Sequence, residues 1–375
     1  MSSQPVRVQV VPEIHARRRA ALRSTIQDQH NGLDAVLITN LLNVRYLTGF
    51  TGSNAALLVA AAGDDESVFC TDGRYQTQSG EQVPELRRLI ERPSDLALAR
   101  AATGAGLRRV GFESHHVTVD GLTALQAAAQ GCELVRTPGA VERLRIVKDD
   151  TEIEALRMAC AVADAALADL LAAGGIAPGR TELDVARDLE GRMRDHGARG
   201  PSFESIVATG ANSAVPHHRP TGAALQRGDL LKLDFGALVD GYHSDMTRMI
   251  VLGEPADWQR ELYELVAVAQ AAGRAALRPG ATVREVDAAA REVIEAAGHG
   301  DRFLHGLGHG VGLEIHEAPM LLKTGDGKLS AGMTVTVEPG VYLAGRGGVR
   351  IEDTLVVRDE APELLTLTTK QLVVV

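Results

Sequence analysis

The sequence is poor in cysteine. It contains three, Cys70, Cys132 and Cys160, among 375 residues. They are too few and too widely spaced for a disulfide framework or a cysteine-based zinc site. We therefore expect them to be small core residues in a reducing compartment, which favours a cytoplasmic protein.

The sequence also lacks long apolar segments. No apolar run approaches the ~20 residues that a membrane-spanning helix needs. Residues 1–20 contain Pro5, Pro12 and three consecutive arginines at 17–19, and no apolar stretch of the kind found in signal peptides. We therefore expect no membrane partner.

An excess of basic residues is missing as well. Residues 1–145 contain 16 Lys and Arg against 15 Asp and Glu, a net charge of +1. Residues 146–375 contain 23 against 34, a net charge of −11. An acidic surface disfavours nucleic acid, so we expect no such partner. The acidic half is compatible with cation binding, although solvated helix faces account for most charge of this kind.

Several familiar catalytic and phosphate-binding motifs are absent. There is no His-Glu-x-x-His and no Gly-x-Ser-x-Gly, which excludes zincin-type and serine-hydrolase sites. The glycine-rich segment His305-Gly-Leu-Gly-His309-Gly-Val-Gly312 fits neither G-x-G-x-x-G nor the P-loop pattern. We expect its glycines to let the backbone approach a site closely.

The first 145 residues have the pattern of an α/β domain. Short apolar runs of the buried-strand type lie at 34–39, 55–60, 67–70 and 108–112, with a turn at 63–65. Helical stretches lie near 13–31, 74–80 and 121–130. The polar cluster 148–152 marks the boundary, where Thr151 followed by Glu154 predicts a capping box for the next helix. We therefore expect domains at 1–145 and 146–375.

The second domain contains an internal repeat. Pro178-Gly-Arg-Thr181 aligns with Pro279-Gly-Ala-Thr282, and each Thr predicts a helix N-cap. Gly197 and Gly298 then suit the ends of the two helices. The repeated unit predicts helix, helix, strand, a loop with a histidine, strand and strand.

The same repeat relates four acids and two histidines. Leu225 to Gly236 aligns with Leu329 to Gly340, and the remaining pairs are His217 with His316, Asp234 with Glu338, and Asp245 with Glu352. Each member of the Asp234/Glu338 pair follows a β-type run, so both should lie at strand ends. Taken singly, such an acid ends a strand in a turn as often as it serves a site. Four buried unpaired carboxylates around one pseudo-axis would be costly, which favours a metal centre.

These acids, together with His309, form an oxygen-rich ligand set. Such a set suits Mn²⁺ or Co²⁺ better than structural Zn²⁺. Two divalent ions would balance four negative charges, and shared carboxylates would hold them about 3.5–4 Å apart.

Three further residues keep two interpretations each. His217 and His316 are either satisfied loop histidines or donors to a substrate and its developing oxyanion. Arg350 lies two residues before Glu352 and would point to the same face of an extended strand. It either pairs with a ligand acid or binds a substrate carboxylate.

At these residues the sequence resembles the Xaa-Pro aminopeptidases and prolidases, a family that also contains methionine aminopeptidases and creatinase. The resemblance rests on Lys-Leu-Asp234-Phe-Gly, Ser-Asp245-Met-Thr-Arg, His305-Gly-Leu-Gly-His309, Val-Glu338-Pro-Gly and Val-Arg350-Ile-Glu352-Asp. It extends to the N-terminal half through residues 43–54 and 71–75. Methionine aminopeptidases lack that N-terminal domain, and creatinases lose the metal ligands.

The resemblance implies an α+β protein with a C-terminal pseudo-two-fold pita-bread fold and an N-terminal α/β creatinase-like domain. It implies that Asp245 and Glu352 bridge two ions, with His309 and Glu338 completing one site and Asp234 the other. It matches His217 and His316 to the family's substrate-binding and transition-state histidines. We assign catalytic roles to Glu338, His217 and His316, and substrate binding to His305 and Arg350. It further implies a homodimer whose N-terminal domains restrict the substrate.

The resulting hypothesis is metal-dependent hydrolysis of the Xaa-Pro peptide bond. Glu338 would carry a proton from water to the leaving proline nitrogen, and a histidine would stabilise the oxyanion. We favour an Xaa-Pro dipeptidase slightly over an Xaa-Pro aminopeptidase that acts on longer peptides. A pita-bread module that binds peptides without turnover is the alternative outside enzymes, and the intact ligand set speaks against it.

Overall fold

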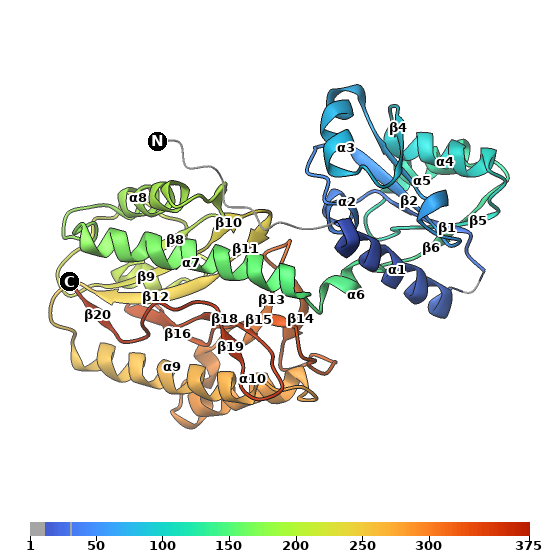
Figure 1. The fold of residues 1–375 in the computed structure, drawn as a ribbon. Coiled ribbons are helices and arrows are strands. Elements are labelled where there is room, and N and C mark those ends of the chain that lie inside the picture. The colour runs from blue at the N-terminus through green and yellow to red at the C-terminus, as the bar shows by residue number, and fades with distance from the viewer. Residues whose placement is uncertain (1–11, 31) are drawn as a thin grey trace. The chain divides into compact units, whose positions relative to one another are not determined.

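A computed structural model describes residues 12–30 and 32–375, which form two compact units divided between Arg145 and Ile146 (Figure 1). Among the described residues, no helix combines the length and the apolar character that crossing a membrane requires. The two units are described separately below.

The N-terminal unit is a six-stranded mixed sheet with helices packed against it. Its strands have the order β4-β3-β2-β1-β5-β6, in which β1, β5 and β6 run parallel. The elements are α1 (Pro12–Gln29), β1 (Ala35–Ile38), α2 (Leu41–Thr48), β2 (Ala55–Ala60), β3 (Val68–Thr71), α3 (Gln76–Gln82), β4 (Arg87–Ile90), α4 (Ser94–Gly104), β5 (Arg109–Phe112), α5 (Val119–Ala128), β6 (Glu133–Arg136) and α6 (Glu142–Arg145).

The predicted strands of this unit correspond to β1, β2, β3 and β5, whose residues are almost all buried. The predicted helix 13–31 corresponds to α1, and its last position, 31, lies outside the described residues. The sequence patterns missed β4 and β6. These are the two edge strands, and their exposed residues leave no continuous apolar run to detect.

The C-terminal unit consists of two similar halves. The first contains α7 (Asp150–Ala172), α8 (Glu182–Asp195), β7 (Gly200–Pro201), β8 (Ile206–Thr209), β9 (Leu230–Phe235), β10 (Ala237–Val239), β11 (Tyr242–His243) and β12 (Met246–Val251). The second contains α9 (Asp257–Ala276), α10 (Val283–Ala296), β13 (Gly308–Gly310), β14 (Glu317–Leu321), β15 (Thr334–Val337), β16 (Gly340–Leu343), β17 (Gly347–Arg350) and β18 (Asp353–Val356). The chain ends with β19 (Glu363–Leu364) and β20 (Val373–Val374).

The sheets reproduce the internal repeat. The antiparallel order β12-β9-β8 in one half corresponds to β18-β15-β13 in the other. Helices α7 and α8 lie on one side of the strands, and α9 and α10 lie on the opposite side (Figure 1). Each helix pair closes an apolar core against the strands, and the core under α9 and α10 also includes Leu230, Met249 and Val251 from β9 and β12. The strands that carry the predicted ligands therefore lie between two helical layers.

The helix ends agree with the repeat in four places and differ from the prediction in one. Thr181 and Thr282 cap α8 and α10, each in a capping box. Gly197 and Gly298 follow these helices with φ of 99° and 78°, where only glycine is unstrained. The predicted capping box of Thr151 and Glu154 is wrong.

Asp149 is instead the N-cap of α7, and Glu152 completes the box. The Asp149 carboxylate accepts both the Thr151 and the Glu152 backbone N–H at 3.0 Å. A single carboxylate thus satisfies two donors and carries a charge that favours the helix N-terminus.

The glycine-rich segment at 305–312 is closely packed. A Cβ on Gly308 would lie 2.0 Å from the Thr336 carbonyl oxygen, and one on Gly310 would lie 2.3 Å from that of Ala318. These glycines therefore allow β13 to approach its neighbouring strands, and Gly306 and Gly308 also line the pocket that contains the predicted site residues.

Gly236 imposes a similar constraint between two predicted ligands. A Cβ there would lie 1.8 Å from the backbone carbonyl oxygen of Ser244, beside Asp245. We expect Gly236→Ala to destabilise the fold by at least about 1–3 kcal/mol because the two segments must separate. Thermal unfolding should show a midpoint several degrees lower. Gly222→Ala is the matched control, since a Cβ at that position meets no atom within 4 Å; equal midpoints for the two variants would contradict the expectation.

Candidate metal centre and peptide pocket

All of the residues predicted for the site line one pocket of about 460 Å³. The lining includes His217, Asp234, Asp245, His305, His309, His316, Glu338, Arg350 and Glu352. The structure thus brings together side chains that are spread over more than a hundred positions of the sequence.

The five predicted ligands come from corresponding strands of the two halves. Asp234 is the penultimate residue of β9 and Asp245 directly precedes β12, whereas His309 lies in β13, Glu338 follows β15 and Glu352 lies between β17 and β18. Asp245, Glu338 and Glu352 therefore lie just outside strand ends, whereas Asp234 and His309 lie within their strands.

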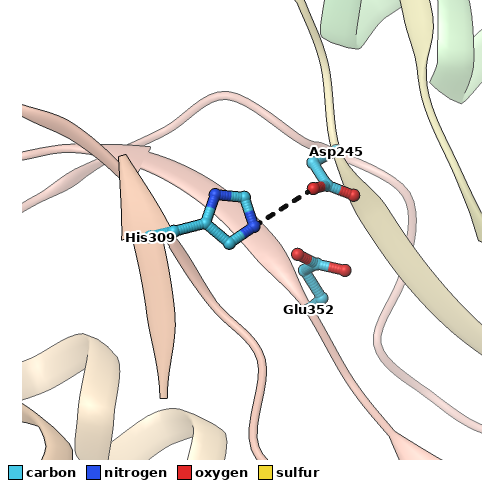
Figure 2. A group of neighbouring side chains, drawn as sticks. All are labelled: Asp245, His309 and Glu352. Atoms are coloured by element: carbon cyan, nitrogen blue, oxygen red, sulfur yellow. Dashed lines mark ion pairs between the residues drawn. The ribbon is translucent and has the colours of Figure 1, made fainter. Parts of the chain in front are cut away.

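Three of these side chains converge closely. Asp245, His309 and Glu352 each offer a ligand atom within 4.8 Å of the others, and they point toward one another from separate segments (Figure 2). The His309 Nε2 atom lies 3.5 Å from Asp245 Oδ2 and 3.4 Å from Glu338 Oε1. The His309 Nδ1 atom lies 3.0 Å from the Gly310 carbonyl oxygen, to which it donates. That bond leaves Nε2 available for a metal.

The electrostatics of this cluster fit a cation. Burial raises the pKa of Asp245 to about 6 and that of Glu338 to about 7, and it also raises the pKa of Glu352. Neighbouring acids add to each shift. Burial alone would lower the pKa of His309, but Asp245 and Glu338 raise it to about 9. Crowded carboxylates of this kind need a compensating positive charge to remain ionised at neutral pH.

Unsatisfied oxygen atoms give the same indication. Asp234 Oδ1 and Glu352 Oε1 are buried and have no hydrogen-bond partner among the described residues. Buried polar atoms in native proteins are almost always satisfied, and metal coordination is one way to satisfy them. The residues present therefore fit a divalent metal centre.

Two threonines that the sequence reasoning did not select orient the ligands. Thr247 Oγ1 donates to Glu352 Oε2 at 2.7 Å, and Thr336 Oγ1 donates to Glu338 Oε1 at 3.2 Å. The backbone N–H of His309 donates to Thr336 at 3.1 Å. Residues that hydrogen-bond to metal ligands in this way restrict the orientation of the ligand groups. The only sequence signal for Thr247 is its place in the repeated block Asp245-Met-Thr247.

Arg350 is buried, and its guanidinium is bonded to other groups of the protein. Its guanidinium forms an ion pair with Asp234 and donates from Nη1 to Tyr342 Oη at 2.8 Å. Nε donates to Thr247 Oγ1 at 3.1 Å. Of the two interpretations of Arg350, pairing with a ligand acid is the one that these contacts support.

His305 also makes contacts inside the protein. Nε2 lies 2.8 Å from Tyr342 Oη and Nδ1 lies 2.8 Å from the Gly306 carbonyl oxygen. Burial lowers the pKa of His305 to about 3, and nearby Arg350 adds to the shift. His305 is therefore neutral in the pocket wall.

The two repeat-related histidines lie in the pocket wall. The His316 ring packs edge-on against His309, with ring centres 4.3 Å apart. Burial and the neighbouring His309 lower the pKa of His316, so it is mainly neutral at pH 7. His217 lies on the loop that leads to β9.

Two buried charged residues hold the His217 loop, and neither was selected from the sequence. Lys232 donates to the carbonyl oxygens of Ser213, Val215 and Pro216 at 3.2, 2.6 and 3.2 Å. Burial lowers the pKa of Lys232 to about 6. The three carbonyl acceptors nevertheless match the three N–H donors of the protonated amine, and we therefore assign the protonated form.

On the other side of His217, the fully buried Glu182 accepts from His218 Nε2 at 2.8 Å and from the Thr221 backbone N–H and Oγ1 at 2.9 and 2.7 Å. It also accepts from Thr209 N–H and Asn212 Nδ2, both at 2.9 Å. The loop is thus fixed on both sides of His217.

The comparisons with known proteins place this geometry in a family. The sequence profile described as metallopeptidase family M24 matches residues 154–359, and the creatinase/prolidase N-terminal domain matches residues 18–147. The chain therefore belongs to metallopeptidase family M24. Membership implies a peptide substrate and divalent metal ions at the site.

Particular relatives cover almost the whole chain. It is 35% identical to an Xaa-Pro dipeptidase of Pyrococcus furiosus over 91% of this chain and 96% of that protein. The structure of an Xaa-Pro dipeptidase from Bacillus anthracis matches with a TM-score of 0.91 and 39% identity, covering 96% of this chain and 100% of that one. An X-Pro aminopeptidase from Thermotoga maritima matches with a TM-score of 0.87 and 32% identity, covering 93% and 99%. The predicted α+β pita-bread class is confirmed.

The buried acids predict a metal effect that depends on pH. In the metal-free fold, Asp245 and Glu338 retain protons up to about pH 6 and 7, whereas in the unfolded chain they release them near their ordinary values of 3.8 and 4.5. Because the folded state then binds more protons, the metal-free protein loses stability as pH rises through this window. Added Mn²⁺ competes with those protons.

We therefore expect Mn²⁺ to raise the melting temperature more at pH 7.5 than at pH 5.5. Differential scanning fluorimetry of chelator-treated protein, with and without Mn²⁺ at each pH, measures this. Equal increases at both values would contradict competition with protons at these acids.

The Glu182 anchor gives a second prediction. Burial would raise the pKa of Glu182, but hydrogen bonds, led by that from Asn212, lower it below the ordinary 4.5. The charged form therefore stabilises the fold above pH 4.5, and this contribution is lost as pH falls through the lowered pKa. Glu182→Gln should cost about 1–3 kcal/mol at pH 7 because donors lose their acceptor.

Denaturant unfolding measures this cost, which should shrink below pH 4.5. Glu254→Gln is the control, because the Glu254 side chain is 83% exposed and pairs only with Arg260 among the described residues. An equal loss of unfolding free energy in both variants, or a loss that persists below pH 4.5, would refute the proposed anchoring role of Glu182.

Proposed function

We propose that this protein hydrolyses the Xaa-Pro peptide bond of dipeptides with two divalent metal ions. The observation that carries the proposal is the convergence of three buried acids, the partly buried Glu338 and His309 in a pocket that is large enough for a small peptide. The dipeptidase preference is supported by relatives that are named Xaa-Pro dipeptidases.

The proposed metal ligands are shared out as the family resemblance implies. Asp245 and Glu352 would be shared between the ions, His309 and Glu338 would complete one site, and Asp234 the other. Oxygen-rich donors favour Mn²⁺, with Co²⁺ as the next candidate and Zn²⁺ less suited. Bound there, the ions would make water a nucleophile near neutral pH and polarise the scissile carbonyl.

The remaining chemistry belongs to side chains of this chain. Glu338, oriented by Thr336, would accept the proton of the attacking water and deliver it to the departing proline nitrogen. His217 and His316 face the same pocket from repeat-related loops and would donate to the substrate carbonyl and the developing oxyanion. Lys232 and Glu182, which hold the His217 loop, would keep the His217 side chain in place, so the loop need not reorganise when substrate binds.

The pocket wall supports a proline substrate. Apolar side chains line it beside the acids, namely Phe203, Ile206, Ile315, Met320 and Leu322. A proline ring is apolar and offers no backbone N–H for recognition. Packing against such a wall is therefore a suitable way to recognise it.

A second candidate is an Xaa-Pro aminopeptidase that acts on longer peptides, which the Thermotoga maritima structure favours. Rates on Ala-Pro and Ala-Pro-Ala, with Mn²⁺ or Co²⁺ added, separate the two. Higher kcat/KM on Ala-Pro supports the dipeptidase, and higher kcat/KM on Ala-Pro-Ala supports the aminopeptidase. Hydrolysis of neither peptide would refute both candidates.

We also propose that the protein is a cytoplasmic homodimer. Residues 1–145 would form the dimer contacts and restrict the substrate. Light scattering measures whether the protein is a dimer in solution.

The assignment of Glu338 predicts a specific loss. Glu338→Gln keeps the size of the side chain but removes the proton acceptor and one anionic ligand, so kcat should fall by about 10²–10⁴-fold. Metal content measured on the same sample separates lost chemistry from lost metal. Asp240→Asn, at the turn between β10 and β11, is the control. Near-normal kcat in metal-loaded Glu338→Gln would remove Glu338 from its proposed role.

A further inference from the structure

The pocket has an uneven distribution of charge that bears on substrate selection. Its acids Asp234, Asp245 and Glu352 are buried at 7%, 5% and 1% exposure. A dipeptide carries an ammonium group and a carboxylate close together. The buried acids offer no hydrogen-bond donor to its carboxylate, which needs a cationic side chain elsewhere in the pocket wall.

Among the described residues that line the pocket, few cations are available for that task. Arg350 is engaged by Asp234, Thr247 and Tyr342. His305 is hydrogen-bonded to Tyr342 and to the Gly306 carbonyl oxygen, His316 packs against the His309 ring, and His309 lies among the acids. Arg219 is the remaining arginine of the lining, and its side chain is 82% exposed.

The backbone around Arg219 is held in place although its side chain reaches solvent. His218 and Thr221, on either side of it, both donate to the buried Glu182 carboxylate at 2.7–2.9 Å. Pro220 follows directly and restricts Arg219 to an extended backbone. The arginine is therefore presented from a fixed position, only two residues from His217.

The existing partner of Arg219 can be displaced. Arg219 Nε lies 3.3 Å from Glu204 Oε2, and the Glu204 side chain is 64% exposed. Exposed ion pairs of this kind contribute only about 0–1 kcal/mol. A substrate carboxylate that binds the guanidinium through two hydrogen bonds can therefore replace Glu204.

The internal repeat shows that this cation is specific to one half. His217-His-Arg219-Pro220 aligns with His316-Glu-Ala318-Pro319, so Ala318 occupies the position of Arg219 in the second half. Both loops reach the pocket through their histidines, but only the first adds a positive charge. This asymmetry gives the pocket a direction along which an asymmetric dipeptide can align.

We propose that Arg219 binds the C-terminal carboxylate of an Xaa-Pro dipeptide and thereby sets a preference for dipeptides over longer chains. The inference rests on the proposed function and names the residue behind its substrate class. A third residue in the substrate moves the carboxylate away and puts a neutral amide in its place.

The test compares Ala-Pro with Ala-Pro-amide, which differ in this charge alone. In Arg219→Ala, kcat/KM for Ala-Pro should fall by about 10- to 100-fold, mainly through KM, because a hydrogen-bonded charge pair is lost. The value for the amide should fall far less, and Arg219→Lys should recover part of the loss. Arg284→Ala is the matched control, since its 60% exposed side chain pairs with Asp326 outside the pocket lining.

A binding measurement separates this inference from the proposed function. Isothermal titration calorimetry with L-proline and L-prolinamide, on metal-loaded and metal-free protein, requires no turnover. Wild-type protein should bind proline more tightly, and Arg219→Ala should lose that difference. Equal losses for Ala-Pro and its amide, or an unchanged preference for proline in Arg219→Ala, would overturn the role of Arg219 even in an active Xaa-Pro peptidase. Absence of hydrolysis with the proline preference intact would refute the proposed function alone.

Discussion

The mutual repulsion of buried carboxylates is the constraint on which the C-terminal unit depends. Burial raises the pKa values of Asp245, Glu338 and Glu352, and the nearby charge of Asp234 adds to each shift. Packing alone gives no reason to gather them, since apolar residues of similar size would cost less. Divalent metal ions resolve the conflict, and unsatisfied oxygens on Asp234 and Glu352 are in position to contact them. The two helical layers and their sheets then act as a rigid frame that holds the acids at strand ends.

The two halves share a frame but have diverged in what they attach to it. Lys232 and Thr336 occupy equivalent repeat positions, yet Lys232 binds the carbonyls of the His217 loop while Thr336 orients Glu338 and His309. Glu182 anchors the same loop, whereas its counterpart is Val283, which lies in the apolar core. Duplication therefore explains the acids and the histidines, and divergence explains why the two walls of the pocket differ.

Features that follow from local chemistry could be predicted from the sequence. The capping threonines, the left-handed glycines and the buried strands each depend on a few neighbouring residues, and the repeat brought the distant acids into correspondence. Residues that act through tertiary contacts gave no such signal. Glu182 follows a helix cap and looks like an ordinary first-turn acid, and its five hydrogen-bond donors come from positions 209 to 221. The capping box of α7 failed for a different reason, because several polar residues in 148–154 satisfy the same pattern.

The polarity of the pocket bears on the choice between dipeptides and longer peptides. Acids at the base attract the substrate ammonium group, and the exposed Arg219 attracts a carboxylate. In a dipeptide these two charges are separated by one peptide unit, and the proline ring narrows the range of that separation by fixing φ. The backbone that carries the acids is held in place by the strands, and the backbone that carries Arg219 is held in place by Glu182. Neither the substrate nor the pocket must reorganise on binding, so the pocket selects substrates whose two charges have the matching separation, and thereby selects by peptide length. An apolar wall alone would accept the proline of a peptide of any length.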